Sequence, residues 1–117
     1  MHERSITRQL LLQLEELMAT YRPDHVVSIR ISVGEFSGIE PSLLSIAFDE
    51  MSLNTSVEGA EFIVDAVPLE GRCAICTNEF LVHQFKFECP RCGSSSVTFT
   101  RGEELMLESV VMEAEEP

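Results

Sequence analysis

Four cysteines in two pairs are the residues of this 117-residue chain best suited to chemistry. Cys73 and Cys76 form one C-x2-C pair, and Cys89 and Cys92 form a second pair after twelve intervening residues. Each pair suits a tight turn whose backbone amides point at the sulfurs, and two such turns together supply the four thiolates of a tetrahedral zinc site. Four thiolates leave no open coordination position, so we expect structural zinc. Few apolar residues lie between the pairs, so zinc binding should contribute on the order of 10 kcal/mol to the folding of this segment.

Two disulfides, a redox dithiol and an iron–sulfur cluster are the alternatives for these cysteines. Gln9, Gln13, Glu15 and Glu16 interrupt any apolar N-terminal run, so the sequence predicts no export signal and a reducing cytoplasm. No thioredoxin-like βαβ pattern surrounds the pairs, and paired turns in a β-rich segment favour zinc over iron–sulfur. His83 lies between the pairs and is expected on a hairpin surface, with an accessory ligand role as the alternative.

The first three residues, Met1-His2-Glu3, form a second candidate metal site. The amine of Met1, the backbone nitrogen of His2 and the His2 imidazole can close consecutive chelate rings around one ion. The backbone nitrogen or carboxylate of Glu3 would complete a planar four-donor set, which suits Ni(II) or Cu(II) and suits zinc poorly. A histidine at position 2 also occurs by chance in many proteins, but a helix beginning at once would anchor this tail.

Composition excludes several classes of function. The chain has 8 basic and 20 acidic side chains and a net charge of −12, which argues against a nucleic-acid or anionic-membrane binder. No run of about 18 apolar residues is present, so no membrane span is expected. The acidic surface serves solubility or steers docking to a basic partner face. An apolar fraction of 44% is ordinary for a globular protein of one domain, or one domain plus an insert.

Two helices are predicted. The first runs from about Glu3 to Tyr21 and ends before Pro23. Its apolar stripe, at 100° per residue, consists of Ile6, Leu10, Leu14, Leu17 and Tyr21. The second begins at Pro41, which suits the first position of a helix. Its apolar residues, spaced i, i+3, i+4, i+7, are Leu44, Ala47, Phe48 and Met51.

Three segments alternate with the period of a half-buried strand: residues 27–33, 61–66 and 104–111. In the last, Leu105, Leu107 and Val111 are expected on one face. The fold class is therefore α+β, a small three-stranded sheet with two helices plus an inserted zinc-ribbon-like β domain. Residues 1–70 and 102–117 are assigned to the first domain and residues 71–101 to the insert. A hinge at residues 69–71 could exchange halves between chains, and we expect a monomer or weak homodimer.

Several segments occur together in one order. They are Met1-His2-Glu3, residues 34–41 (GEFSGIEP), residues 58–60 (EGA), the two cysteine pairs, Gly93-Ser94 and residues 102–105 (GEEL). This arrangement resembles the HypA/HybF family, the nickel-incorporation accessory proteins of hydrogenase maturation, over nearly the whole chain.

The resemblance implies a cytoplasmic nickel metallochaperone without enzymatic activity. Ni(II) would be the cargo, bound through Met1, His2 and Glu3, and structural Zn(II) would be held by the four cysteines. A maturation GTPase would be the partner in delivery to the large subunit of [NiFe]-hydrogenase, or to urease in some organisms. Neither nucleic acid nor a membrane is expected as a partner.

Two positions bear on how far the resemblance extends. Thr77 and Asn78 follow the second cysteine, where many members have Gly or Ser and then His, which puts histidine-dependent switching at zinc in doubt. Glu40 is either an extra nickel ligand or an acid that completes the start of the second helix. Glu35 and Glu40 could also form a catalytic carboxylate pair, which we reject because the chain has no nucleophile motif and no phosphate loop.

The main alternative function is a zinc-ribbon module that docks on proteins or associates with nucleic acid without transferring nickel. Such a module would carry basic and aromatic residues over the ribbon. Arg72, Lys86 and Arg91 are present there but few, on a chain with a net charge of −12.

Overall fold

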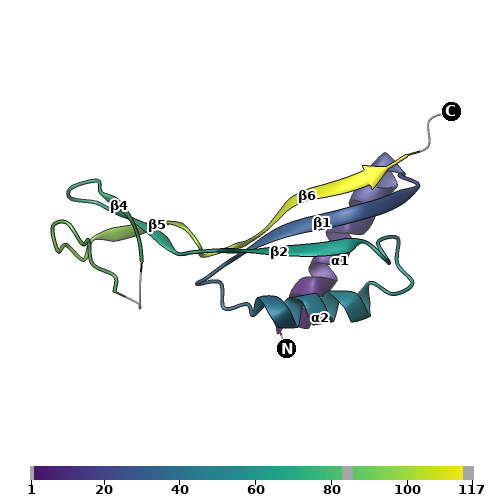
Figure 1. Ribbon diagram of the computed structural model, residues 1–117, viewed down its shortest axis with the longest axis horizontal. Helices are drawn as coiled ribbons and strands as arrows, with labels where there is room; N and C mark the ends of the chain where they lie inside the picture. The colour runs from purple at the N-terminus through teal and green to yellow at the C-terminus, as the bar shows by residue number, and fades with distance from the viewer. Residues whose placement is uncertain (1, 83–85, 115–117) are drawn as a thin grey trace.

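The computed structural model describes residues 2–82 and 86–114, without the side chain of His2. The molecule is elongated, with extents of 59 × 34 × 18 Å (Figure 1). The described residues form two helices and two three-stranded sheets, which confirms the predicted α+β class. Within the described ranges, no helix combines the length and the apolar character that a membrane span requires.

The first sheet has the strand order β2-β1-β6. Its central strand β1 (His25–Gly34) pairs in parallel with β2 (Glu61–Val67) and antiparallel with β6 (Leu105–Glu113). All three strands lie on the segments whose alternation predicted them. The parallel pair needs a crossover, which α2 (Pro41–Met51) provides.

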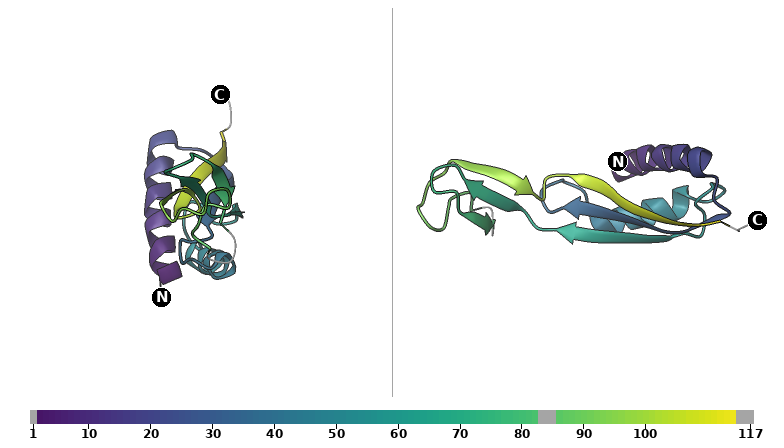
Figure 2. Two further views of the ribbon diagram at one scale, coloured as in Figure 1. Left: turned by 90° about the vertical axis from the view of Figure 1, so that its left-hand side faces the viewer. Right: turned by 90° about the horizontal axis from the view of Figure 1, so that it is seen from above.

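One apolar core joins α1 (His2–Tyr21), α2 and β1. The buried residues of this core are Leu10, Leu14, Met18, Val26, Ile29, Ile31, Val33, Leu44, Phe48 and Val57. Phe48 of α2 stacks on Phe62 of β2, with ring centroids 4.0 Å apart. α1 covers one face of the first sheet (Figure 2), and α2 runs beside β2 (Figure 1). We call α1, α2 and the first sheet the helical body.

The buried face of α1 differs from the predicted stripe. Leu10 and Leu14 are buried as expected, but Tyr21 is 66% exposed, and the core side of α1 also buries Thr7 near its start and Met18 near its end. Thr7 can be buried because its hydroxyl donates to the carbonyl of Glu3, at 2.7 Å, so no polar group is left without a partner. The predicted stripe therefore lies too far round the helix.

A β-bulge in β6 also changes the expected orientation of side chains. The register shifts at Glu108, which lies between two successive residue pairs of the β1–β6 ladder. Beyond the bulge Val110 packs against the core and Val111 is 49% exposed. The prediction that Val111 shares a face with Leu105 and Leu107 is wrong, because one extra residue reverses the alternation.

The second sheet consists of β3 (Glu70–Cys73), β4 (Glu79–Leu81) and β5 (Val97–Arg101), all antiparallel, in the order β4-β3-β5. We call this sheet with its two cysteine turns the cysteine module; it lies at the opposite end of the long axis from α1 (Figure 1). Chain segments cross closely at the junction. A Cβ on Gly34 would overlap the carbonyl group of Gly102, and one on Gly102 (φ 97°) would lie 2.5 Å from the Cα of Leu69.

Candidate metal centres

The two cysteine pairs form turns of the same construction. In the first turn the N–H groups of Ile75 and Cys76 donate to the sulfur of Cys73, at 3.4 and 3.5 Å. In the second turn the N–H of Arg91 donates to the sulfur of Cys89, at 3.4 Å. These bonds favour thiolates, because an N–H donor stabilises a negatively charged sulfur.

The turns bring all four sulfurs together, with every Sγ within 4.8 Å of the others. The Sγ atoms of Cys73 and Cys92 are 3.5 Å apart, and those of Cys76 and Cys89 are 3.6 Å apart. These distances exceed a disulfide bond of about 2.05 Å and approach the edge of about 3.8 Å in a zinc–thiolate tetrahedron. The donor set therefore fits a tetrahedral divalent ion, and zinc is the ion for which four thiolates are typical.

The ionisation of the thiols points the same way. Burial raises the pKa of Cys89, but N–H donors from Cys92 and Arg91 outweigh it and lower the pKa to about 6. At Cys92 the N–H of Ser94 lowers the pKa, but the sulfur of Cys73, burial and the other sulfurs outweigh it and raise the pKa to about 12. The cluster thus keeps a proton that a divalent cation would replace.

Asn78 contributes to this cluster in a way that sequence reasoning missed. Its side-chain N–H group donates to the sulfur of Cys89, at 3.8 Å, so the first turn reaches across to the second. Thr77 just before it has φ 62°, and the equivalent residue of the second turn is Gly93, with φ 77°. The matching C-x2-C-x frames signalled the equivalence of these two positions, but the cross-turn contact depends on how the turns pack.

The N-terminal site is described in part. α1 begins at His2, and Glu3 is buried in its first turn, at 8% exposure. The side chain of Arg4 pairs with Glu50 of α2, at 2.9 Å, which fixes the start of α1 to the second helix. Met1 and the imidazole of His2 lie outside the described residues, as does His83. The first helix thus begins directly at the N-terminal segment, as expected from the sequence.

The structure gives Glu40 a capping role. Its Oε1 accepts hydrogen bonds from the backbone N–H of Ser42, at 3.3 Å, and from the Ser42 hydroxyl, at 2.9 Å. An acid in this position offsets unpaired N–H groups and the positive end of the α2 dipole. The structural alternative stated for Glu40 therefore accounts for it, and its part in a nickel site stays a prediction.

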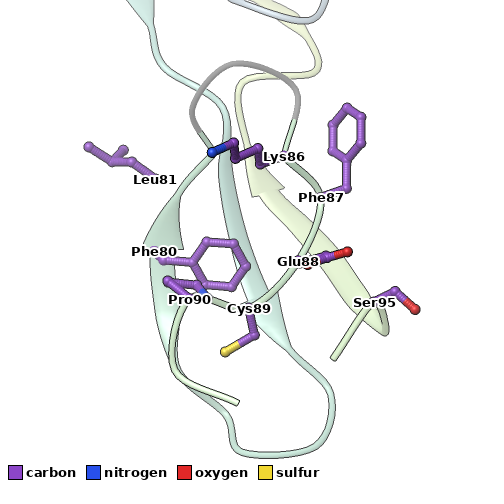
Figure 3. Close-up of a pocket in the computed structure, with 8 residues that line it drawn as sticks. All are labelled: Phe80, Leu81, Lys86, Phe87, Glu88, Cys89, Pro90 and Ser95. Carbon is purple, nitrogen blue, oxygen red and sulfur yellow. The ribbon is translucent and has the colours of Figure 1, made fainter. Parts of the chain in front are cut away.

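A hollow of about 930 Å³ opens beside the cysteine cluster. Its lining is mostly apolar and consists of Phe80, Leu81, Lys86, Phe87, Glu88, Cys89, Pro90 and Ser95. In Figure 3 the sulfur of Cys89 points away from Lys86 and Phe87, and Lys86 is the single basic residue drawn. One lysine beside one glutamate makes no basic footprint, so this face of the module does not favour a nucleic-acid interface.

Comparison with known proteins places these features in one family. Residues 1–112 match the family model described as "Hydrogenase/urease nickel incorporation, metallochaperone, hypA". The chain is 34% identical over 113 residues to the hydrogenase maturation factor HypA of Desulfitobacterium hafniense, covering 97% of this chain and 99% of that protein. It is 32% identical over 115 residues to the HypA of Aquifex aeolicus, covering 98% and 100%.

Solved structures show the same fold. The solution structure of the nickel metallochaperone HypA from Helicobacter pylori superposes with a TM-score of 0.70 at 26% identity, covering 97% of this chain and 98% of that one. A second solution structure of a HypA protein gives a TM-score of 0.70 at 29% identity, covering 98% of each chain.

Proposed function

Because this chain belongs to the HypA family of metallochaperones for hydrogenase and urease nickel incorporation, we propose that it binds Ni(II) at its own N-terminus and delivers it during [NiFe]-hydrogenase maturation. The observation that carries the proposal is the family match from residue 1 onward, on a chain whose first helix begins at residue 2. Insertion into urease is the alternative destination.

The start of α1 suits metal binding by backbone nitrogens. The first four N–H groups of a helix have no partner within the helix. Metal binding by the backbone nitrogens of His2 and Glu3 would therefore break no bond of the helical i to i−4 ladder. Together with the Met1 amine and the His2 imidazole these nitrogens would make a square-planar set, which suits Ni(II). Such a site is ordered mainly by its ion, which allows release when a partner offers a competing ligand.

The cysteine cluster has a separate role in the proposal. Cys73, Cys76, Cys89 and Cys92 hold zinc as a closed site, which supplies folding free energy and no open position for catalysis. The protein is accordingly not an enzyme. Domain boundaries at residues 70/71 and 101/102 separate the nickel-binding part from the zinc-binding part.

The partners follow from the same role. The protein binds a maturation GTPase and the hydrogenase large subunit in the cytoplasm, where it acts as a monomer or weak homodimer. The net charge of −12 favours a basic face on the partner and disfavours nucleic acid and anionic membrane.

The test is a Ni(II) titration of zinc-loaded protein with a native, tag-free N-terminus. Calorimetry measures the stoichiometry, and visible absorption identifies square-planar nickel. We expect the wild type to bind one Ni(II), and His2→Ala and a chain with one added N-terminal residue to lose it while zinc stays bound. His25→Ala is the matched control, because His25 begins β1, beyond the C-terminal end of α1, where it lies 3.2 Å from Glu113.

Equal nickel binding by all of these proteins, or by none, would overturn the N-terminal site. The chain would then be a zinc-stabilised docking module without nickel transfer.

A further inference from the structure

Strand β6 has the composition of a central strand but lies at an edge of the first sheet. Its nine residues include no Lys, Arg or Pro, and six of them are apolar: Leu105, Met106, Leu107, Val110, Val111 and Met112. Exposed edges are usually protected by charges, prolines or a covering element, because their free N–H and C=O groups pair readily with another strand. Its protective features are the bulge at Glu108 and the acidic side chains of Glu108 and Glu113, and no proline or basic residue adds to them.

The other edge of the sheet is better protected. β2 has seven residues, carries Glu61 and Asp65, and is followed by Pro68. Asp65 is held by Arg30 of β1, at 2.6 Å, and α2 runs beside β2 (Figure 1). A strand added to the first sheet would therefore pair with β6.

Apolar side chains are accessible on both faces of β6. Met106 and Val111 are 53% and 49% exposed. On the face toward α1 a groove of about 690 Å³ runs between the helix and residues 105–107, and a second groove of about 500 Å³ continues toward Met112. Leu17 of α1 and Leu107 line both grooves, so the two adjoin.

The acidic charge of these grooves indicates which kind of partner segment would bind β6. Among the described residues that line the two grooves, the charged ones are Glu16 and Glu108, and none is basic. A segment that alternates apolar and basic side chains would match this edge, since its backbone pairs with β6 while its basic groups meet the acidic surroundings.

We infer that β6 and the adjoining face of α1 form a docking edge for an extended, basic and apolar segment of a partner protein, which adds a fourth strand to the first sheet. A second copy of this chain is the weaker occupant, because each copy carries a charge of −12 and β6 pairing would bring Glu104, Glu108 and Glu113 of the two copies near one another. The inference goes beyond the nickel function and depends on neither metal site.

The test uses zinc-loaded full-length protein and a fluorescent peptide of about ten residues that alternates Lys and Val. We expect anisotropy to show binding that weakens with salt, and amide exchange of β6 to slow when the peptide is bound. The same peptide with alternate amides methylated, and one with Glu in place of Lys, should bind at least about tenfold more weakly.

Two sets of variants locate the edge. Met106→Lys with Val111→Lys should weaken binding about tenfold or more through like-charge repulsion. Leu43→Lys with Leu53→Lys makes the same charge change at residues 47% and 57% exposed elsewhere, and should have a much smaller effect. Should the strand variants fail to fold, Glu16→Lys against Asp49→Lys makes the comparison on exposed helical positions.

Binding that is equal in both members of each pair would show general attraction to an acidic protein and would overturn the inference, as would the absence of binding. Light scattering covers the remaining outcome. A wild-type dimer that Met106→Lys with Val111→Lys dissociates would identify a second copy as the occupant and would also overturn it.

Discussion

The helical body and the cysteine module are stabilised by different means. The body contains the whole apolar core cluster, with Leu14, Ile29, Ile31 and Leu44 fully buried. The buried side chains of the module include two of the cysteines, Cys73 and Cys89. One part of the chain thus folds by removing apolar surface from water, and the other brings together four sulfurs that could hold a metal ion.

Metal removal should produce the largest difference in stability between the body and the module. A chelator, or Cys89→Ser, removes zinc binding worth on the order of 10 kcal/mol, so the second sheet should unfold while the body stays folded. Amide spectra recorded with and without zinc measure this, and adding zinc back should restore the module. A second sheet that stays folded without metal would show that the module, like the body, does not need a metal to fold.

Acidification should have the same effect on the module alone. The pKa of Cys89 is about 6 in the folded module, below the ordinary 9.0. A lowered thiol pKa stabilises the module above pH 9.0, and this contribution is lost as the pH falls through about 6. We therefore expect the zinc affinity to fall more steeply with decreasing pH below about pH 6 than above it, as measured with a zinc-sensitive dye. Asn78→Ala should raise the pH at which this change of slope occurs, because it removes a donor to the Cys89 sulfur.

Truncation of a core side chain should affect the body alone. Phe48 is 1% exposed and stacks on Phe62, so Phe48→Ala should cost about 3–5 kcal/mol in urea denaturation without changing zinc affinity. Leu12→Ala, at a residue 62% exposed on α1, is the control and should cost about 0.5 kcal/mol or less. A parallel loss of zinc affinity in Phe48→Ala would show that the two parts fold as one unit.

Three phenylalanines connect the two parts. Phe36, in the loop after β1, lies against Phe87 and Phe99 of the cysteine module, with ring centroids 5.8 and 6.2 Å apart. Phe36→Ala should remove about 1–3 kcal/mol of contact free energy between the parts and widen the range of their orientations, because two aromatic pairs are lost and each contributes about 0.5–1.5 kcal/mol. Residual dipolar couplings measure the orientation. Leu81→Ala, at a residue 45% exposed in the module, should leave it unchanged.

The smallest expected effects come from substitutions in the two cysteine turns. Thr77 adopts φ 62°, where a β-branched residue is strained, while Gly93 adopts φ 77° at no such cost. Thr77→Gly should stabilise the zinc-bound module by about 1 kcal/mol, and Gly93→Ala should destabilise it by a similar amount. Competition with a chelating dye measures both variants. Changes of the same sign would show that the turns are not equivalent.

Local chemistry made much of the fold predictable. The spacing of Cys73, Cys76, Cys89 and Cys92 indicated a four-sulfur cluster, because a C-x2-C turn holds its two sulfurs close whatever surrounds it. The alternation of apolar residues likewise predicted the strands of the first sheet. These signals depend on neighbours within a few residues and therefore survive in the sequence alone.

Side-chain orientation was predicted less well. Val111 faces away from Leu107 because of a bulge, and Tyr21 is exposed on α1 although the predicted apolar stripe includes it. Both outcomes depend on the packing of one element against another, which hydrophobic periodicity does not describe.

By itself the sequence determined the α+β class and the four sulfur donors, and it predicts chelating residues at the N-terminus, since each depends on residue type and short spacing. Only the tertiary structure decided that Glu40 caps α2, that Asn78 donates to Cys89, that Phe36 meets Phe87 and Phe99, and that β6 is an open edge. The physical reason is distance along the chain. Strand order and contacts between remote residues depend on the free energy of the whole packed molecule, and no short segment of sequence specifies them.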